Sequence, residues 1–242
     1  GQNVEDAIRQ YKFDRDAREP LFAFGRCLAH FAVDPHLVYM TTHLDGSKTV
    51  FHPFNQGWNG GAGNPPAWRN FSTAYLWEGM WARDSLLNLI ERFIHVVDEE
   101  DDKGRKTGER HLIFPRYHQL DCVRRLIADA KATGAGNRYL IQHSAGSGKS
   151  NTIAWLAHQL SVLHDDTDYR LFDSIIVVTD RRILDRQLQR TVRQFEQTRG
   201  VVENIDKTSR QLQTALEEGK TIIVTTLQKF PVIVNQVSAL PG

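Results

Sequence analysis

Cysteine is scarce in this chain, and long apolar runs are missing. The two cysteines, Cys27 and Cys122, lie too far apart in sequence to indicate a metal-ligand cluster or a disulfide framework. No stretch reaches the roughly 18 consecutive apolar residues of a membrane-spanning helix, and the first residues are polar, unlike a secretion signal. The sequence therefore predicts no membrane association and a reducing compartment, the cytoplasm.

The chain also lacks a large excess of charge of one sign, because its net charge is only +1 at pH 7. The basic excess lies in residues 111–242 and includes the arginines Arg181, Arg182, Arg186, Arg190 and Arg193. Such an excess permits a polyanionic partner without requiring one. A run of this kind is more often the solvated face of a helix than a binding surface.

Residues 98–110 form the clearest break in the sequence. They contain no apolar residue and two glycines, a composition typical of an exposed linker or long loop. We therefore expect one domain over residues 1–97, a linker over 98–110 and a second domain over 111–242.

Residues 1–97 mix helical and strand patterns. Asp45 and Gly46 separate two β-prone runs, which is a hairpin signal. The glycine-rich run 57–66 is incompatible with regular structure. The patterns predict a helix at 5–11, strands at 37–42 and 49–54, and a helix at 85–97.

Residues 111–242 alternate between strands and helices. Two continuous apolar runs, 175–179 and 222–226, are typical of strands covered on both faces. Alternation of this kind predicts crossover connections and a parallel sheet, hence an α/β domain. The expected elements are strands at 139–142, 175–179 and 222–226, and helices at 148–163, 182–197 and 208–218.

A glycine-rich motif stands between the first of these strands and the helix that follows. It consists of His143, Ser144, Ala145, Gly146, Ser147, Gly148, Lys149 and Ser150. The glycines let backbone N–H groups converge on an anion at a helix N-terminus. Lys149 supplies a positive charge to the β- and γ-phosphates, and the Ser150 hydroxyl supplies a ligand to Mg²⁺. The motif predicts ATP and Mg²⁺ as cofactors, although His143 replaces the first glycine of the common form, as in several helicase-type motors.

Five segments together resemble the restriction subunit of type I restriction–modification enzymes. Residues 142–150 resemble the first helicase motif of that family, 177–187 its second conserved block, and 224–230 the block before its Asp-Glu box. Upstream, residues 16–30 and 51–57 resemble the end of the nuclease domain and its connection to the motor.

The resemblance implies a nuclease domain followed by RecA-like motor domains. On this reading the chain holds the C-terminal part of an α+β nuclease domain, then an incomplete α/β motor domain with a parallel sheet and a phosphate loop. The implied activity is ATP-dependent DNA translocation and endonucleolytic cleavage. The implied partners are double-stranded DNA and the modification (methyltransferase) and specificity subunits. The Asp-Glu box, the second motor domain and the nuclease Asp and Glu-x-Lys residues are expected outside this chain.

Further candidate site residues are identified by their position, most of them relative to the predicted strands and the phosphate loop. Gln119 precedes the phosphate loop, where related motors read adenine with a glutamine; otherwise it is a helix-start residue. Gln10 is a candidate nuclease-site residue, or simply an exposed helix residue. The candidate DNA contacts lie at or just after the ends of the strands 175–179 and 222–226, and they are Thr179, Arg181, Thr225 and Thr226. The alternative for the threonines is that they only cap the strand ends. The histidines His30, His36, His43, His52 and His118 show no metal-ligand spacing.

Two other functions remain open at this point. One is an ATP-dependent helicase or remodeller without nuclease activity. The other is a non-catalytic fragment that binds nucleotide. An Asp…Glu-x-Lys arrangement upstream of Gly1 would exclude the first.

Overall fold

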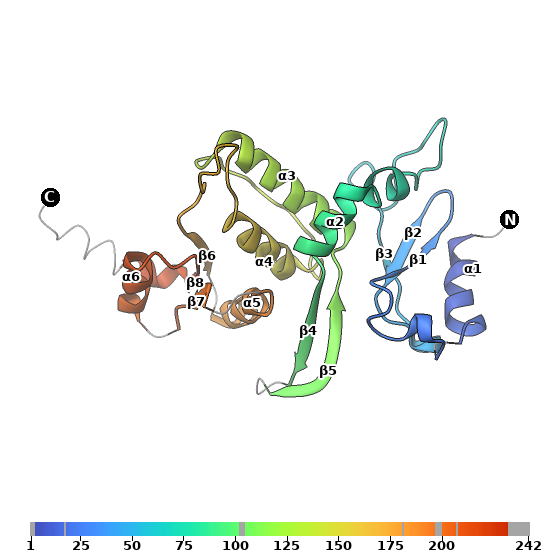
Figure 1. Ribbon diagram of the computed structural model, residues 1–242, viewed down its shortest axis with the longest axis horizontal. Helices are drawn as coiled ribbons and strands as arrows, with labels where there is room; N and C mark the ends of the chain where they lie inside the picture. The colour runs from blue at the N-terminus through green and yellow to red at the C-terminus, as the bar shows by residue number, and fades with distance from the viewer. Residues whose placement is uncertain are drawn as a thin grey trace, which may run out of the picture. The chain divides into compact units, whose positions relative to one another are not determined.

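The computed structural model describes residues 3–16, 18–101, 105–180, 182–196, 200–206 and 208–231. The chain divides into two compact units, residues 1–120 and 121–242, and helix α3 (Tyr117–Thr133) begins in the first and continues in the second (Figure 1). None of the described helices is both long and apolar enough to cross a membrane.

The first unit contains a small antiparallel sheet in the order β1-β2-β3. Tyr39 pairs with Pro53 and Met40 with His52, so the predicted hairpin around Asp45 is present. Strand β1 was not predicted. The elements of residues 3–53 are α1 (Val4–Arg9), the π-helix Gln10–Asp14, the 3₁₀-helices Pro20–Phe22 and Gly46–Lys48, β1 (His30–Val33), β2 (Val38–Thr41) and β3 (His52–Pro53).

An aromatic cluster forms the centre of the first unit. The Phe54 ring is almost fully buried and meets the rings of Phe31, Phe114 and Tyr117 at centroid distances of 5.7, 6.0 and 5.8 Å. The hydroxyl of Tyr75 donates a hydrogen bond to the carbonyl oxygen of Phe54. Edge-to-face aromatic contacts of this kind add to the hydrophobic stabilisation of a core.

The predicted helix at 85–97 is shorter than expected. Helix α2 (Arg83–Arg92) follows the π-helix Leu76–Met80 and ends before His95, where strand β4 (His95–Glu100) begins. β4 pairs antiparallel with β5 (Lys106–Ile113). The predicted linker at 98–110 is therefore largely a β-hairpin, because strand pairing uses backbone groups and needs no apolar side chains. The predicted domain boundaries themselves stay a prediction.

The second unit contains the predicted parallel sheet, in the order β6-β8-β7. Its strands are β6 (Ile175–Thr179), β7 (Val202–Asn204) and β8 (Ile222–Thr226). β8 is buried at every position, as predicted. Among the described strands β6 lies at an edge of the sheet. Ile176 and Val178 are 40% and 44% exposed, so the prediction of cover on both faces is wrong for β6.

Helices cover the sheet of the second unit from two sides, with α6 (Ser209–Glu217) on one and α5 (Arg182–Gln194) on the other (Figure 1). Leu212 and Ala215 of α6 pack with Ile205 and Ile223. Leu188, Val192 and Phe195 are buried on the other side, at the spacing that predicts an amphipathic helix. The 3₁₀-helix Leu227–Lys229 follows β8.

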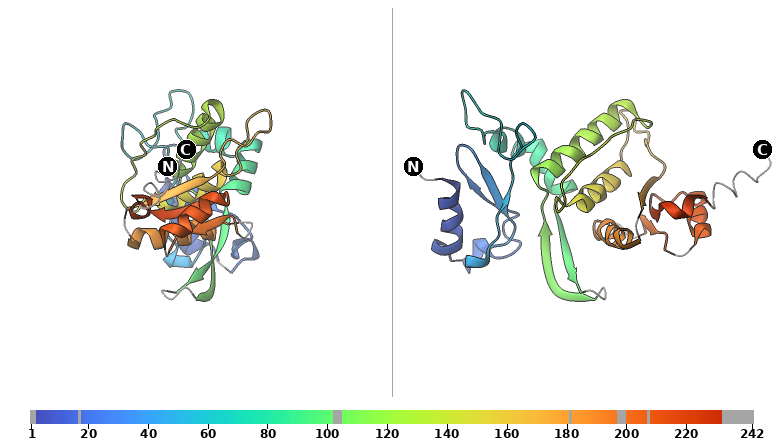
Figure 2. Two further views of the ribbon diagram at one scale, coloured as in Figure 1. Left: turned by 90° about the vertical axis from the view of Figure 1, so that its left-hand side faces the viewer. Right: turned by 180° about the vertical axis from the view of Figure 1, so that it is seen from behind.

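Helix α4 (Lys149–Leu160) packs against α5. The spacing of Ile153, Leu156, Leu160 and Leu163 predicts that these residues form its buried face, and the structure differs. Trp155 is 1% exposed and its ring lies 5.4 Å from that of Phe195, whereas Ile153 is 37% exposed. A tryptophan buries more apolar surface than an isoleucine, so its position decides which face of the helix turns inward. Figure 2 shows α4 and α5 from behind.

Candidate nucleotide-binding site

The phosphate loop has the backbone that its glycines predict. Gly146 and Gly148 have φ angles of 72° and 79°, in the left-handed region that residues with a Cβ rarely adopt. A Cβ on Gly146 would meet no atom within 4 Å, so the requirement for glycine at this position comes from the backbone conformation and not from crowding.

Helix α4 begins at the end of this loop. Its N-cap residue is Gly148, and no side chain caps the first turn. The first N–H groups of a helix have no partner within the helix, and the helix dipole places partial positive charge there. The glycine turn therefore presents these donors to a phosphate group, which is the geometry of an anion site.

Lys149 points back over the loop. Its ammonium group donates hydrogen bonds to the carbonyl oxygens of His143 and Ser144, at 3.1 and 2.7 Å. Lys149 itself is exposed, Ser150 is half-buried and Ser147 is buried. The ammonium thus lies beside the loop backbone, where it can hold phosphate charge, and Ser150 follows it on the first turn, where a hydroxyl can hold Mg²⁺. Ala145 completes the loop and is exposed.

The predicted strand at 139–142 is absent. These residues lead directly into the phosphate loop without forming a strand. Within the described residues the sheet contains only β6, β8 and β7, and none of them pairs with this segment. Leu140 is 94% exposed. A segment becomes a strand only through hydrogen bonds to a neighbour, which apolar composition alone does not supply. The hydroxyl of Tyr139 donates a hydrogen bond to Asp129 of α3.

Gln119 lies at the start of α3, in the first unit. It is 3% exposed, and its side-chain oxygen accepts a hydrogen bond from the backbone N–H of Arg116 at 2.8 Å. This is the reciprocal half of a capping box, in which the third helical residue caps the residue before the helix. Gln119 is therefore a helix-start residue, but a buried one, and its role in reading adenine stays a prediction.

The three candidate threonines end two neighbouring strands. Thr179 pairs with Thr226 in the register of β6 and β8, and the Thr179 hydroxyl lies 3.5 Å from the carbonyl oxygen of Thr225. Thr225 is fully buried, and its hydroxyl has no hydrogen-bond partner among the described residues. Contact with DNA stays a prediction for all three, and Arg181 lies outside the described residues.

Gln10 begins the π-helix of the first unit and is half-buried. Its neighbour Tyr11 packs against the rings of Phe22, His30 and Phe51. Burial raises the pKa of the Tyr11 hydroxyl. The assignment of Gln10 to a nuclease site is not tested by this arrangement.

A parallel sheet with covering helices, together with a phosphate loop at the head of one of them, defines a nucleotide-binding α/β protein. The family model for the SWI2/SNF2 ATPase matches residues 118–240, just over half of the chain. The chain belongs to this family of helicase-like ATPases. No curated protein and no solved structure matches it significantly.

Proposed function

We propose that the chain is part of the restriction subunit of a type I restriction–modification system, and that its second unit contributes to an ATP-driven motor on double-stranded DNA. The observation that carries the proposal is the phosphate loop: two left-handed glycines, an uncapped helix N-terminus and Lys149 bonded to the loop backbone. Membership of the helicase-like ATPase family supports the use of this loop for ATP. The resemblance of the upstream segments to a nuclease domain supports the restriction assignment.

In the proposed mechanism Lys149 would hold the phosphates and Ser150 would hold Mg²⁺. The ammonium of Lys149 would neutralise charge on the phosphoryl group that is transferred, and Mg²⁺ held by the Ser150 hydroxyl would supply further charge neutralisation. Gln119 would select adenine through its side-chain amide. Thr179 and Thr226 lie at the carboxyl ends of parallel strands, where ligands of open α/β sheets bind. There they would contact the DNA backbone, with Arg181.

The motor part of the proposal is tested by nucleotide binding. We expect this chain to bind MgATP and to bind GTP more weakly, with affinities measured by calorimetry. Translocation, measured as triplex displacement by the protein that contains these residues, should require ATP. Absence of MgATP binding at millimolar nucleotide would contradict the assignment of the loop.

A helicase or remodeller without nuclease activity is the second candidate, and the family match favours it because that match covers only the motor region. DNA cleavage separates the two. The restriction assignment predicts that the protein with its upstream region cleaves DNA only while ATP is hydrolysed. If ATP drives translocation but no DNA is cleaved in the presence of the modification and specificity subunits, the restriction assignment is wrong and the helicase or remodeller assignment is retained.

A further inference from the structure

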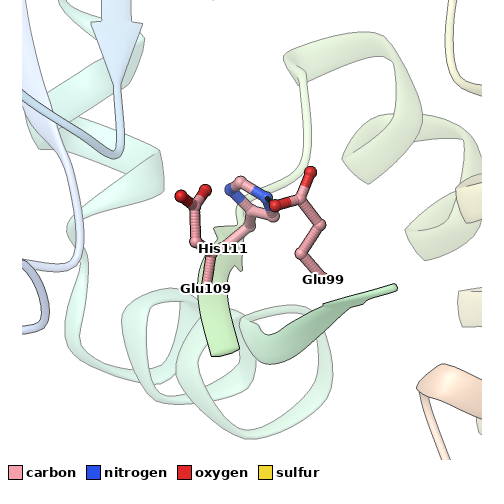
Figure 3. Close-up of side chains that lie close together, drawn as sticks. All are labelled: Glu99, Glu109 and His111. Carbon is pink, nitrogen blue, oxygen red and sulfur yellow. Dashed lines mark ion pairs between the residues drawn. The ribbon is translucent and has the colours of Figure 1, made fainter. Parts of the chain in front are cut away.

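Three side chains that favour metal ions meet on one face of the β4–β5 hairpin. Glu99 comes from β4, and Glu109 and His111 come from β5 (Figure 3). One atom of each, a carboxylate oxygen or an imidazole nitrogen, lies within 4.8 Å of the other two. Nε2 of His111 and Oε2 of Glu99 form an ion pair at 3.7 Å.

The backbone explains why these side chains converge. Glu109 and His111 are two residues apart on one strand, so both project to the same face. The pairing register shifts between Asp98 and Glu100, and Gly108 takes a φ of 92° opposite this shift. A bulge of this kind turns the local strand and re-aims its side chains, which brings Glu109 toward Glu99 across the ribbon.

The charges on the two faces of the hairpin differ. On the other face Asp98 forms an ion pair with Lys106. Among the described residues no lysine or arginine pairs with Glu99 or Glu109, and Glu99 has only the imidazole of His111 as an ion-pair partner. Two carboxylates gathered on one side of a ribbon repel each other unless a cation lies between them.

We propose that Glu99, Glu109 and His111 form a binding site for a divalent transition metal ion, with Zn²⁺ as the best match. Two carboxylates and one imidazole are the ligand types that Zn²⁺ takes, at bond lengths of about 2.0–2.2 Å. Two ligands at such distances on a tetrahedral ion lie about 3.4 Å apart. The separation of 3.7 Å between Nε2 and Oε2 is close to this value. The three ligand atoms lie within 4.8 Å of one another, so side-chain rotations would bring the third ligand, Glu109, to the ion.

A neighbouring hydroxyl orients one of the ligands. The Thr107 hydroxyl donates a hydrogen bond to Oε2 of Glu99 at 3.2 Å, in the way that residues around metal sites fix their ligands. Three protein ligands leave at least one position on the ion for water. Because the ligands come from both strands, the bound ion would hold β4 to β5 beside the bulge.

The test is metal binding by the whole chain at neutral pH. Calorimetric titration with ZnCl₂ should show one site that is weakened at least about tenfold in Glu109→Gln and in His111→Gln. Asp98→Asn is the matched control, since it removes a carboxylate from the same hairpin on the other face, and binding should stay within twofold. Titration with Co²⁺ should give visible absorption bands in the wild type that both ligand variants lose. Zinc binding that is equal in the wild type and both ligand variants, or no saturable binding up to millimolar ZnCl₂, overturns the proposal.

Hydrogen exchange gives a readout that does not depend on affinity alone. Saturating Zn²⁺ should slow amide exchange in residues 95–100 and 106–113 of the wild type, because the ion links the two strands. The His111→Gln variant should show no such change at the same metal concentration, while its exchange without metal matches the wild type. Protection elsewhere in the chain without protection in the hairpin would place the zinc on other histidines and overturn the assignment.

Discussion

The ammonium group of Lys149 donates a hydrogen bond to the carbonyl oxygen of Ser144, 2.7 Å away. A second bond joins it to the carbonyl of His143. The lysine therefore bridges both ends of the loop that its own helix closes. In the proposed site, a bound nucleotide would add phosphate oxygens to an ammonium that the loop backbone already holds in place.

Lys149→Ala should abolish ATP-driven activity and leave the fold intact. Deleting the ammonium removes one charge-assisted contact to the transferring phosphoryl group, which is worth on the order of 3 kcal/mol, or about 100-fold in rate. Stability should change little, because an exposed lysine buries little apolar surface. The measurements are MgATP affinity of this chain, ATPase rate of the protein that contains it, and melting temperature.

Lys220→Ala is the control for that variant. Lys220 pairs with Glu218 and precedes β8, at the end of the sheet opposite the carboxyl ends of the strands. It should leave nucleotide binding unchanged. If Lys149→Ala keeps ATPase activity within about twofold, less than 0.5 kcal/mol in barrier height, the assignment of the phosphate loop is wrong.

Gly146→Ala and Gly219→Ala should destabilise the chain to a similar extent but differ in nucleotide binding. Both glycines have positive φ angles, 72° and 64°, and neither has an atom within 4 Å of an added Cβ. The cost in each case is the left-handed backbone, roughly 1–2 kcal/mol. Only Gly146 lies in the phosphate loop, so only Gly146→Ala should weaken MgATP binding, measured by calorimetry beside urea unfolding. Equal loss of binding in both variants would mean that the effect is general destabilisation.

Gln119→Glu separates the two roles of this residue. A glutamate keeps the oxygen that accepts from the Arg116 N–H, but the side chain at this position is 3% exposed, so the buried carboxylate should lower the melting temperature. It loses the amide N–H₂ that adenine recognition needs. We expect a reduced preference for ATP over GTP, a ratio of affinities that lower stability alone does not change. Gln119→Ala should lose about 1 kcal/mol of stability as well. Unchanged nucleotide preference in both variants would assign Gln119 to helix capping alone.

Acid should destabilise the second unit through His158. Burial lowers the pKa of this imidazole below its ordinary value of 6.5, and this outweighs the hydrogen bond to the Val192 carbonyl and the nearby Glu196 charge. The folded state therefore resists protonation while the unfolded chain accepts a proton. Stability should fall as pH drops below about 6.5, with a slope of up to about 1.4 kcal/mol per pH unit for this one group.

Urea unfolding at pH 7.5 and pH 5.5 measures this effect. His158→Gln keeps a donor for the Val192 carbonyl but cannot titrate, so its loss of stability in acid should be smaller than that of the wild type. Burial also lowers the pKa values of His30 and His52 in the first unit. Both the wild type and His158→Gln retain these two histidines, so the difference between the two proteins reports on His158. Identical pH dependence in the two proteins would exclude a contribution from His158.

Features set by neighbouring residues could be predicted from the sequence. Thr208 caps α6 by accepting from the Gln211 N–H, and Gly219 follows the helix with a positive φ, as the local pattern indicates. The phosphate loop belongs to this class, because its glycine conformations are local. The parallel sheet was also predicted, because β8 and β6 are apolar enough to be recognised as strands.

Features set by distant packing or by pairing partners could not be predicted. The buried face of α4 depends on the contact of Trp155 with Phe195, which no helical periodicity reveals. The hairpin of β4 and β5 carries charged side chains on both strands, so an apolar pattern does not reveal it. Without that hairpin, the Glu-x-His spacing of Glu109 and His111 has no partner strand, and sequence reasoning does not find the proposed metal site. Only the pairing with β4 brings Glu99 beside them.

The central place of β8 has a consequence for synthesis of the chain. β6 and β7 are made first, yet within the described residues each pairs only with β8, which is made last. While α5, β7 and α6 emerge from the ribosome, the apolar strand 175–179 has its backbone groups unpaired, a state prone to aggregation. Assembly of the sheet waits for Thr226 to emerge, so a ribosome that stalls earlier holds a nascent chain that chaperones must shield.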